Sequence, residues 1–238
     1  MKRYLLFTVF VSGMTTMAAE MAASRLIGNV FGTSNLVWAS IIGLILIYLT
    51  LGYFLGGRWA DSNPTAGALS RALAWAAFTV GLVPYVAGPV LRSAATAFEG
   101  LQVTVLAGSF AAVLVLFVVP ITLLGTISPF AIRLSVEDAT SAGRMAGTIY
   151  AVSTLGSFIG TFLPSLVTIP AIGTKNTFLL FGLLLLFVAL AGLGRFASRR
   201  EMLLHLWMPA ALALAALLSA NQAIKSNTGQ VYEAEAAY

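Results

Sequence analysis

Long apolar runs, separated by short polar segments, dominate this chain of 238 residues. Seven such runs lie near residues 4–31, 36–57, 69–91, 101–132, 145–170, 175–194 and 203–220. A run of about 20 apolar residues is long enough to cross a bilayer as a helix. Lipid offers no water to an open backbone, so helices are the structure expected of these runs. The sequence therefore predicts an all-α polytopic membrane protein, a bundle of about seven transmembrane helices.

The charged residues indicate how the chain is oriented. Only 9% of the residues are charged, against about a quarter in a soluble domain, so the net charge of +5 does not indicate nucleic-acid binding. With the N-terminus in the cytoplasm, nine basic residues lie in cytoplasmic segments and three lie outside. The nine are Lys2, Arg3, Arg58, Arg71, Arg133, Arg144, Arg195, Arg199 and Arg200, and the three are Arg92, Lys175 and Lys225. Because Lys and Arg are retained on the cytoplasmic side, this distribution predicts a cytoplasmic N-terminus.

Two charges fall inside the first apolar run. Glu20 has apolar sequence on both sides, and Arg25 follows five residues later, which places the two about 140° apart around an ideal helix. An ionisable group at membrane depth is costly and marks a functional site by default. Two interpretations remain open: the charges bind or conduct a solute, or they form structural contacts that fix the packing of the helices.

Small residues indicate where helices touch. Three Gly-x-x-x-Gly motifs occur, and such motifs let helix backbones approach closely in a membrane. They are Gly52 with Gly56, Gly143 with Gly147, and Gly156 with Gly160. They fit packing within one chain or a dimer face, and packing within the chain is the interpretation we favour.

The sequence gives no support for a metal centre or a cofactor site. It has no Cys, one His (His205) and no clustered carboxylates, so it offers no ligand set for a metal. No Gly-rich loop for a nucleoside-bearing cofactor is present either. His205 lies at the start of an apolar run beside Glu201, where an interfacial residue is expected more than a proton relay.

The segment after the second run carries Gly57, Arg58 and Asp61. Its Gly-x-x-x-Asp element resembles the loop between helices two and three of major facilitator transporters, in which the Asp helps to close the inward gate. The basic continuation of that motif is missing, since the chain continues Ser-Asn-Pro-Thr-Ala-Gly. An ordinary solvated turn remains the alternative.

Three segments together resemble one family: residues 12–61, residues 143–160 with their Tyr-Ala-Val-Ser-Thr-Leu-Gly core, and the turn from Ile172 to Lys175. This family is the membrane portion of fused major-facilitator/spermidine-synthase proteins. In it, an intramembrane Glu is followed by an Arg near the end of helix one, as Glu20 and Arg25 are here. The resemblance implies a major-facilitator-like half in a bacterial-type inner membrane.

The last residues, 222–238, form a polar tail after the transmembrane domain of residues 1–221. The tail ends Val-Tyr-Glu-Ala-Glu-Ala-Ala-Tyr, similar to the first residues of a spermidine-synthase domain, with Ala236 where Ser is usual. The sequence given holds no catalytic half, so no aminopropyl transfer is expected from it. The resemblance implies an aminopropyltransferase domain as a partner, in the same chain or as a separate one.

Three functions fit these observations. In the first, the bundle binds or transports a small solute, with a polyamine as the substrate that the resemblance implies. Glu20 would then neutralise an ammonium group, and Tyr48, Tyr53 or Tyr150 would offer aromatic faces to the cation. In the second, the bundle is a membrane anchor and scaffold for a synthase domain. In the third, two copies associate as a homodimer to complete a transporter.

Overall fold

The computed structural model describes residues 1–98, 104–136 and 138–219, and almost all of this part of the chain is helical. The α-helices are α1 (Lys2–Phe31), α2 (Asn35–Ser62), α3 (Ala66–Ala97), α4 (Thr104–Ser135), α5 (Ala142–Leu163), α6 (Ile169–Phe196), α7 (Arg199–Leu204) and α8 (Trp207–Leu218). A 3₁₀ turn (Ala139–Ser141) precedes α5, and a π-helical turn (Pro164–Thr168) joins α5 to α6. Six helical spans of the described part are long and apolar enough to cross a membrane, which confirms the all-α, multi-pass class.

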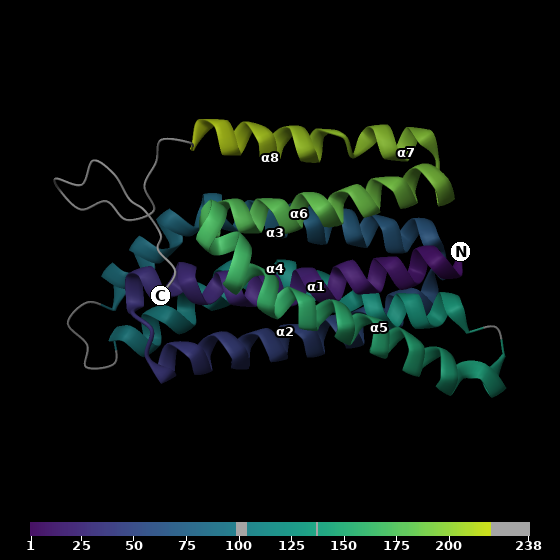
Figure 1. Ribbon diagram of the computed structural model, residues 1–238, viewed down its shortest axis with the longest axis horizontal. Coiled ribbons are helices and arrows are strands. Elements are labelled where there is room, and N and C mark those ends of the chain that lie inside the picture. Colours follow the sequence, from purple (N-terminus) through teal and green to yellow (C-terminus); the bar gives the residue numbers. More distant parts are fainter. Residues whose placement is uncertain (99–103, 137, 220–238) are drawn as a thin grey trace.

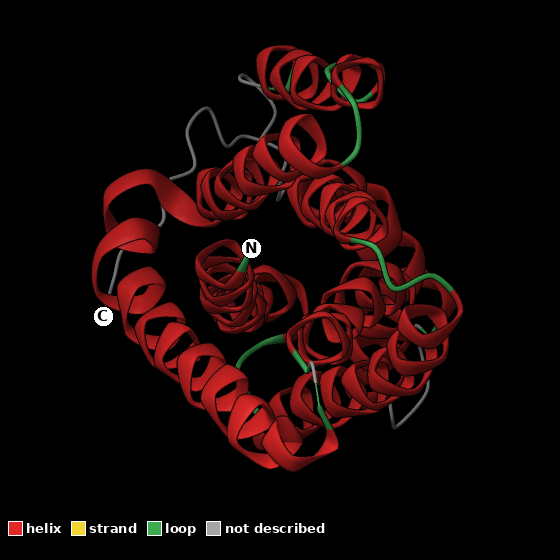
Figure 2. Ribbon diagram, turned by 90° about the vertical axis from the view of Figure 1, so that its right-hand side faces the viewer, coloured by secondary structure: helices red, strands yellow, loops and turns green. Residues whose placement is uncertain are grey.

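The long helices run side by side along the longest axis of the molecule (Figure 1). α1 lies in the middle of the bundle and contacts each of α2 to α6 (Figure 2). Around it, α2 packs mainly on α4, α3 packs on both α4 and α6, and α5 packs on α1. The central position explains why α1 is the most buried of the six spans, although it carries Glu20 and Arg25.

Short polar residues begin three of the helices. The side chains of Ser34, Thr65 and Ser198 accept hydrogen bonds from the backbone N–H groups of Val37, Ala68 and Glu201, at 3.4, 3.2 and 3.1 Å. Each bond satisfies one of the free N–H groups at the first turn of a helix. The caps therefore fix the starts of α2, α3 and α7.

Two turns share both sequence and backbone conformation. Gly32, between α1 and α2, has φ 79° and ψ 178°, and Gly173, near the start of α6, has φ 81° and ψ 164°. Both glycines are followed by Thr, a variable residue and Asn. Within the described residues they are the two with positive φ, a conformation that glycine adopts without steric cost. At Gly173 the 55-residue helical stretch from Ala142 to Phe196 breaks, and α6 runs back toward the end of the molecule at which α5 begins (Figure 1).

The last predicted span, at 203–220, differs from the structure. The helix begins earlier, at Arg199, and is interrupted after Leu204, so that α7 and α8 replace one continuous helix. Pro209 has no N–H to donate to the carbonyl of His205, four residues before it. Instead, His205 and Met208 donate backbone hydrogen bonds to residues three positions earlier, which is the tighter geometry of a helix end.

Candidate functional site

A small cavity of about 130 Å³ lies between α1, α2, α4 and α5. Six hydroxyl-bearing side chains and small or apolar residues line it. The lining residues are Ser12, Gly13, Thr16, Met17, Leu49, Tyr53, Leu124, Gly125, Ser128, Ser153 and Ser157. No Lys or Arg side chain is among them. The cavity is therefore polar without carrying a positive charge.

Close helix crossings build the walls of this cavity. A Cβ atom added at Gly156 or Gly160 of α5 would overlap with the carbonyl oxygen of Phe10 or Met14 of α1. A Cβ at Gly52 of α2 would overlap in the same way with the Thr122 carbonyl oxygen of α4. Glycine is required at these positions because two backbones meet there. The same contacts bring the hydroxyl groups of four helices together.

Two of the six hydroxyls in the cavity offer a ligand only hydrogen-bond acceptors. Thr16 donates its proton to the carbonyl oxygen of Ser12 at 2.9 Å, and Ser157 donates to the carbonyl oxygen of Gly13 at 3.2 Å. A hydroxyl has one proton, so these two oxygens have only lone pairs left for a guest. Ser12, Ser128 and Ser153 form no side-chain hydrogen bond with another described residue and can turn toward a guest either way.

Glu20 lies on the same side of α1 as the cavity. It follows Thr16 by four residues and Met17 by three, the spacings that place residues above one another on a helix. Its side chain is half-buried. Among the described residues it forms neither an ion pair nor a hydrogen bond, and the same holds for Arg25, which is also half-buried. The two predicted intramembrane charges thus lie on one helix without pairing within 4 Å.

At the cytoplasmic end that we predicted for α2, Asp61 accepts a hydrogen bond from Nε of Arg133 at 3.0 Å. This contact ties the end of α2 to the end of α4. Arg58 is exposed, and a Cβ atom at Gly57 would meet nothing within 4 Å. Of the three residues predicted as a gate-like loop, Asp61 is therefore the one that links two helices.

The remaining predicted residues are spread over the bundle. Tyr48 is buried and donates to the carbonyl oxygen of Leu114 at 3.4 Å, Tyr53 lines the cavity, and Tyr150 is exposed. Gly56 lies against Thr126 of α4, whereas Gly143 and Gly147 lie in open space. The polar tail at 222–238 lies outside the described residues.

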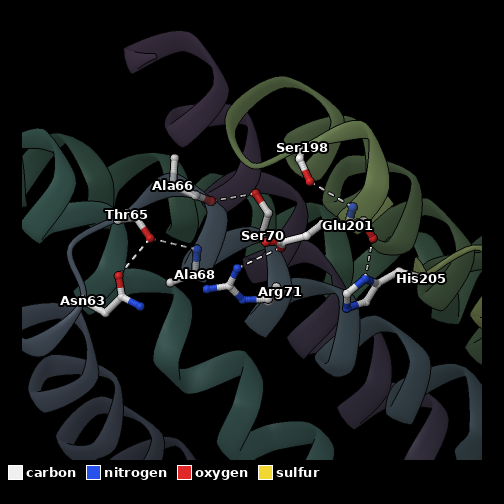
Figure 3. A network of polar contacts seen from close by, with 9 residues as sticks. All are labelled: Asn63, Thr65, Ala66, Ala68, Ser70, Arg71, Ser198, Glu201 and His205. Carbon is white, nitrogen blue, oxygen red and sulfur yellow. Dashed lines mark hydrogen bonds and ion pairs between the residues drawn. The ribbon is translucent and has the colours of Figure 1, made fainter. Parts of the chain in front are cut away.

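A second polar group lies away from the cavity, where α3 meets α7 (Figure 3). Arg71 donates to a carboxylate oxygen of Glu201 at 2.8 Å. The ring Nδ1 of His205 lies 2.7 Å from the backbone carbonyl oxygen of the same Glu201. His205 therefore makes a local contact with the helical turn that precedes it.

The hydroxyl lining is the part of the site that the sequence interpretation missed. Its signal was present as Ser12, Gly13 and Thr16 on one face of the first run and as Ser153 and Ser157 on one face of the fifth. Each set alone reads as an ordinary small-residue face. Only the crossing of α1 with α5 shows that the two sets face the same space.

No group of three or more His, Cys, Asp or Glu residues that could hold a metal ion occurs among the described residues. The fold and the cavity together define a multi-pass helical membrane protein with a polar interior site. Comparison of the chain with protein-family models, with curated proteins and with solved structures gives no match.

Proposed function

We propose that this chain is a membrane module, similar to half of a major facilitator transporter, that binds a small amine cation in the cavity between α1, α2, α4 and α5. The observation that supports the proposal is the lining of that cavity, in which hydroxyl oxygens are gathered at membrane depth without a Lys or Arg. Polar groups inside a membrane bundle are costly and are typical of solute pathways.

Seven crossings are the count that fits this class best. The stretch from Ala142 to Phe196 has 55 residues, about 80 Å as one straight helix, whereas a bilayer core is about 30 Å thick. If this stretch crosses the membrane twice, once on either side of Gly173, the six spans become seven crossings. With a cytoplasmic N-terminus, the predicted nine-to-three distribution of basic residues then follows the rule for an inner membrane.

The two acceptor-only hydroxyls of the lining favour a ligand that donates hydrogen bonds. An ammonium group carries a positive charge and three N–H donors, which match the lone pairs that Thr16 and Ser157 leave free. A carboxylate or phosphate guest would instead need the cationic side chains that the cavity lacks. Glu20, one helical turn away on the same side of α1, adds attraction for a cation.

The size of the cavity limits what it can enclose. A volume of about 130 Å³ corresponds to roughly four water molecules at about 30 Å³ each. Ligand sites for drug-sized molecules measure about 300 Å³ or more. The cavity therefore fits one amine end of a linear polyamine, with the rest of the molecule extending toward Glu20.

Thermal unfolding of the purified protein with putrescine or spermidine tests the proposal. We expect the amines to raise the melting temperature of the wild type, since a ligand at 100 times its Kd adds about 2.7 kcal/mol of stability. Thr16→Val should abolish the shift and Glu20→Gln should reduce it. Thr50→Val is the matched control, because Thr50 makes the same bond to a carbonyl four residues earlier, at 2.8 Å, but faces outward. A shift that survives in Thr16→Val, or no shift in the wild type, would contradict the proposal.

A second candidate function rests on the tail. Residues 231–238 resemble the first residues of a spermidine-synthase domain, which favours an anchor or scaffold for an aminopropyltransferase. In this function Glu20 and Arg25 are structural and no amine enters the cavity. Deleting residues 222–238 should then release a co-expressed synthase domain from the membrane. If the domain stays bound without these residues, the scaffold function of the tail is wrong.

A further inference from the structure

The contact between α1 and α5 follows a spacing of four residues. Gly156 and Gly160 of α5 lie against the carbonyl oxygens of Phe10 and Met14 of α1. Pro164, four residues further on, is also buried. Both helices advance in the same direction by four residues from one contact to the next, so side chains spaced by four keep their position relative to this contact.

Two polar rows with this spacing run beside the contact. The α1 row consists of Ser12, Thr16, Glu20 and Ser24, and the α5 row, which ends in the π-helical turn, consists of Ser153, Ser157, Thr161 and Ser165. The first two members of each row line the cavity. The last two members of each row are half-buried and lie toward the end of α1 at Phe31. The rows therefore lead out of the cavity on one side of the α1–α5 pair.

The two rows also occupy the same register of the sequence. Each member of the α5 row follows its counterpart in the α1 row by 141 positions, and the same shift places the Gly173 turn on the Gly32 turn. Seven of the eight row members carry a hydroxyl group, and the exception is Glu20, whose counterpart is Thr161. Binding sites at the interface between repeated segments are typical of transporters. The match therefore indicates a ligand path that α1 and α5 build together.

Beyond the cavity these rows offer a ligand only hydrogen-bond acceptors. Ser24, Thr161 and Ser165 each donate the hydroxyl proton to a backbone carbonyl oxygen of their own helical segment, at 2.7, 2.9 and 3.1 Å, so that only lone pairs remain. Glu20 forms no hydrogen bond or ion pair with another described residue, and Arg25 lies about 140° away from it around α1. A carboxylate among acceptors in a membrane bundle requires a cation that donates hydrogen bonds.

Ser12 indicates that the cavity end of the path also has room for a ligand. Its side chain lines the cavity, the residue is 5% exposed, and it forms no side-chain hydrogen bond with another described residue. Buried hydroxyl groups normally have a hydrogen-bond partner. A ligand in the cavity supplies one.

We propose that this path binds a linear diamine, with one ammonium group in the cavity and the other beside Glu20. The inference rests on the proposed function and extends it by a second ammonium site, to which α5 contributes Thr161 and Ser165. Thr16 and Glu20 are four residues apart, or about 6 Å along the helix axis. An extended carbon chain advances about 1.2 Å per bond, which gives about 6 Å between the nitrogen atoms of putrescine. A diamine of this length reaches both groups of acceptors at once.

Isothermal titration calorimetry of the purified protein with putrescine and with butylamine tests the second site. The two amines have the same carbon chain, but butylamine lacks the second ammonium group. We expect putrescine to bind the wild type about tenfold or more tightly than butylamine, which is the usual effect of a hydrogen bond to a charged group. Glu20→Gln should bring the ratio of the two affinities close to one.

Thr161→Val tests the contribution of α5, because valine keeps the shape of threonine and removes its hydroxyl group. This variant should also lower the ratio of the two affinities, and Thr161→Ser, which keeps the hydroxyl, should retain the wild-type ratio. Thr148→Val is the matched control, since Thr148 in the same helix makes the same bond to a carbonyl four residues earlier, at 2.9 Å, but is exposed. It should retain the wild-type ratio as well. The melting temperature measured without amine checks that each variant is folded.

Two kinds of result would overturn the proposal, and they differ in what they leave standing. Equal affinities of the wild type for putrescine and butylamine, or a wild-type ratio that survives in Glu20→Gln or in Thr161→Val, would exclude the second ammonium site as proposed, while the cavity still binds an amine. Absence of binding of either amine would overturn the proposed function together with this inference.

Discussion

The α1–α5 crossing and the α7–α8 arm are attached to the bundle by opposite means. At the crossing, Gly156 and Gly160 bring the α5 backbone directly against carbonyl oxygens of α1. The arm is attached by side chains: Trp207 packs edge-on against Trp75 and Phe78 of α3, at 6.1 and 5.0 Å between ring centroids. Little of the arm is buried in the molecule, in contrast to most of α1.

This difference follows from the solvent. Lipid removes the hydrophobic drive that joins helices in water, so stable association in the membrane depends on close backbone packing. When an arm held by large apolar side chains separates from the bundle, these side chains exchange protein contacts for lipid contacts, so the separation costs little free energy. The crossing should therefore tolerate almost no substitution, and the arm should tolerate many.

The largest expected effect is at the crossing. Gly156→Leu should destabilise the bundle by about 3 kcal/mol or more, because a side chain has no space beside the Phe10 carbonyl. Size-exclusion chromatography of the detergent-solubilised protein should show an aggregated or broadened peak. Gly147→Leu is the control in the same helix, where a Cβ atom meets nothing within 4 Å, and it should elute like the wild type. Equal behaviour of the two variants would mean that close backbone contact does not hold α5.

The next effect concerns the two glycine turns that flank the crossing helices. Gly32→Ala and Gly173→Ala should each cost about 1–2 kcal/mol, because φ near 80° is strained for a residue with a Cβ atom. A lower melting temperature for both variants is the expected result. Gly43→Ala is a control that should change the stability in the opposite direction. Gly43 lies exposed inside α2, and alanine there should raise the free energy of unfolding by about 0.5–1 kcal/mol. If the two turn variants differ strongly, the shared Gly-Thr-x-Asn sequence does not imply a shared role.

The sequence was sufficient for the parts of the fold that depend on hydrophobicity and turn chemistry. The apolar runs predicted the helical, multi-pass class, and most of the short polar segments between them lie near the ends of helices. It could not show that α1 is central, because burial by other helices and burial by lipid select the same residues. Nor could the sequence show that Ser12 and Ser153 line one cavity, because they come from runs far apart in the chain.

The next effect is confined to the arm. Trp207→Ala removes two edge-to-face contacts, each worth about 0.5–1.5 kcal/mol, and should loosen α7 and α8 while leaving α1 to α6 folded. Limited trypsin digestion at the exposed Arg199 and Arg200 reports on this change, and we expect faster cleavage there. Leu217→Ala is the control: Leu217 is 76% exposed, and trypsin should cleave this variant at the wild-type rate. Aggregation of Trp207→Ala would show instead that the arm is part of the core.

The smallest effect should come from the ion pair between the arm and α3. Glu201→Gln removes the charge that Arg71 contacts at 2.8 Å, and the two side chains are 36% and 35% exposed. A pair this accessible to solvent contributes about 0–1 kcal/mol. Asp61→Asn at the ends of α2 and α4 gives the comparison, because Arg133 and Asp61 are 49% and 73% exposed and their pair should contribute still less. We expect trypsin cleavage of Glu201→Gln to exceed the wild type slightly at low salt and to match it at high salt, since salt screens the exposed pair. A difference that persists at high salt would mean that the Glu201 carboxylate holds the arm through its hydrogen bond from Arg71 and not only through screened charge attraction.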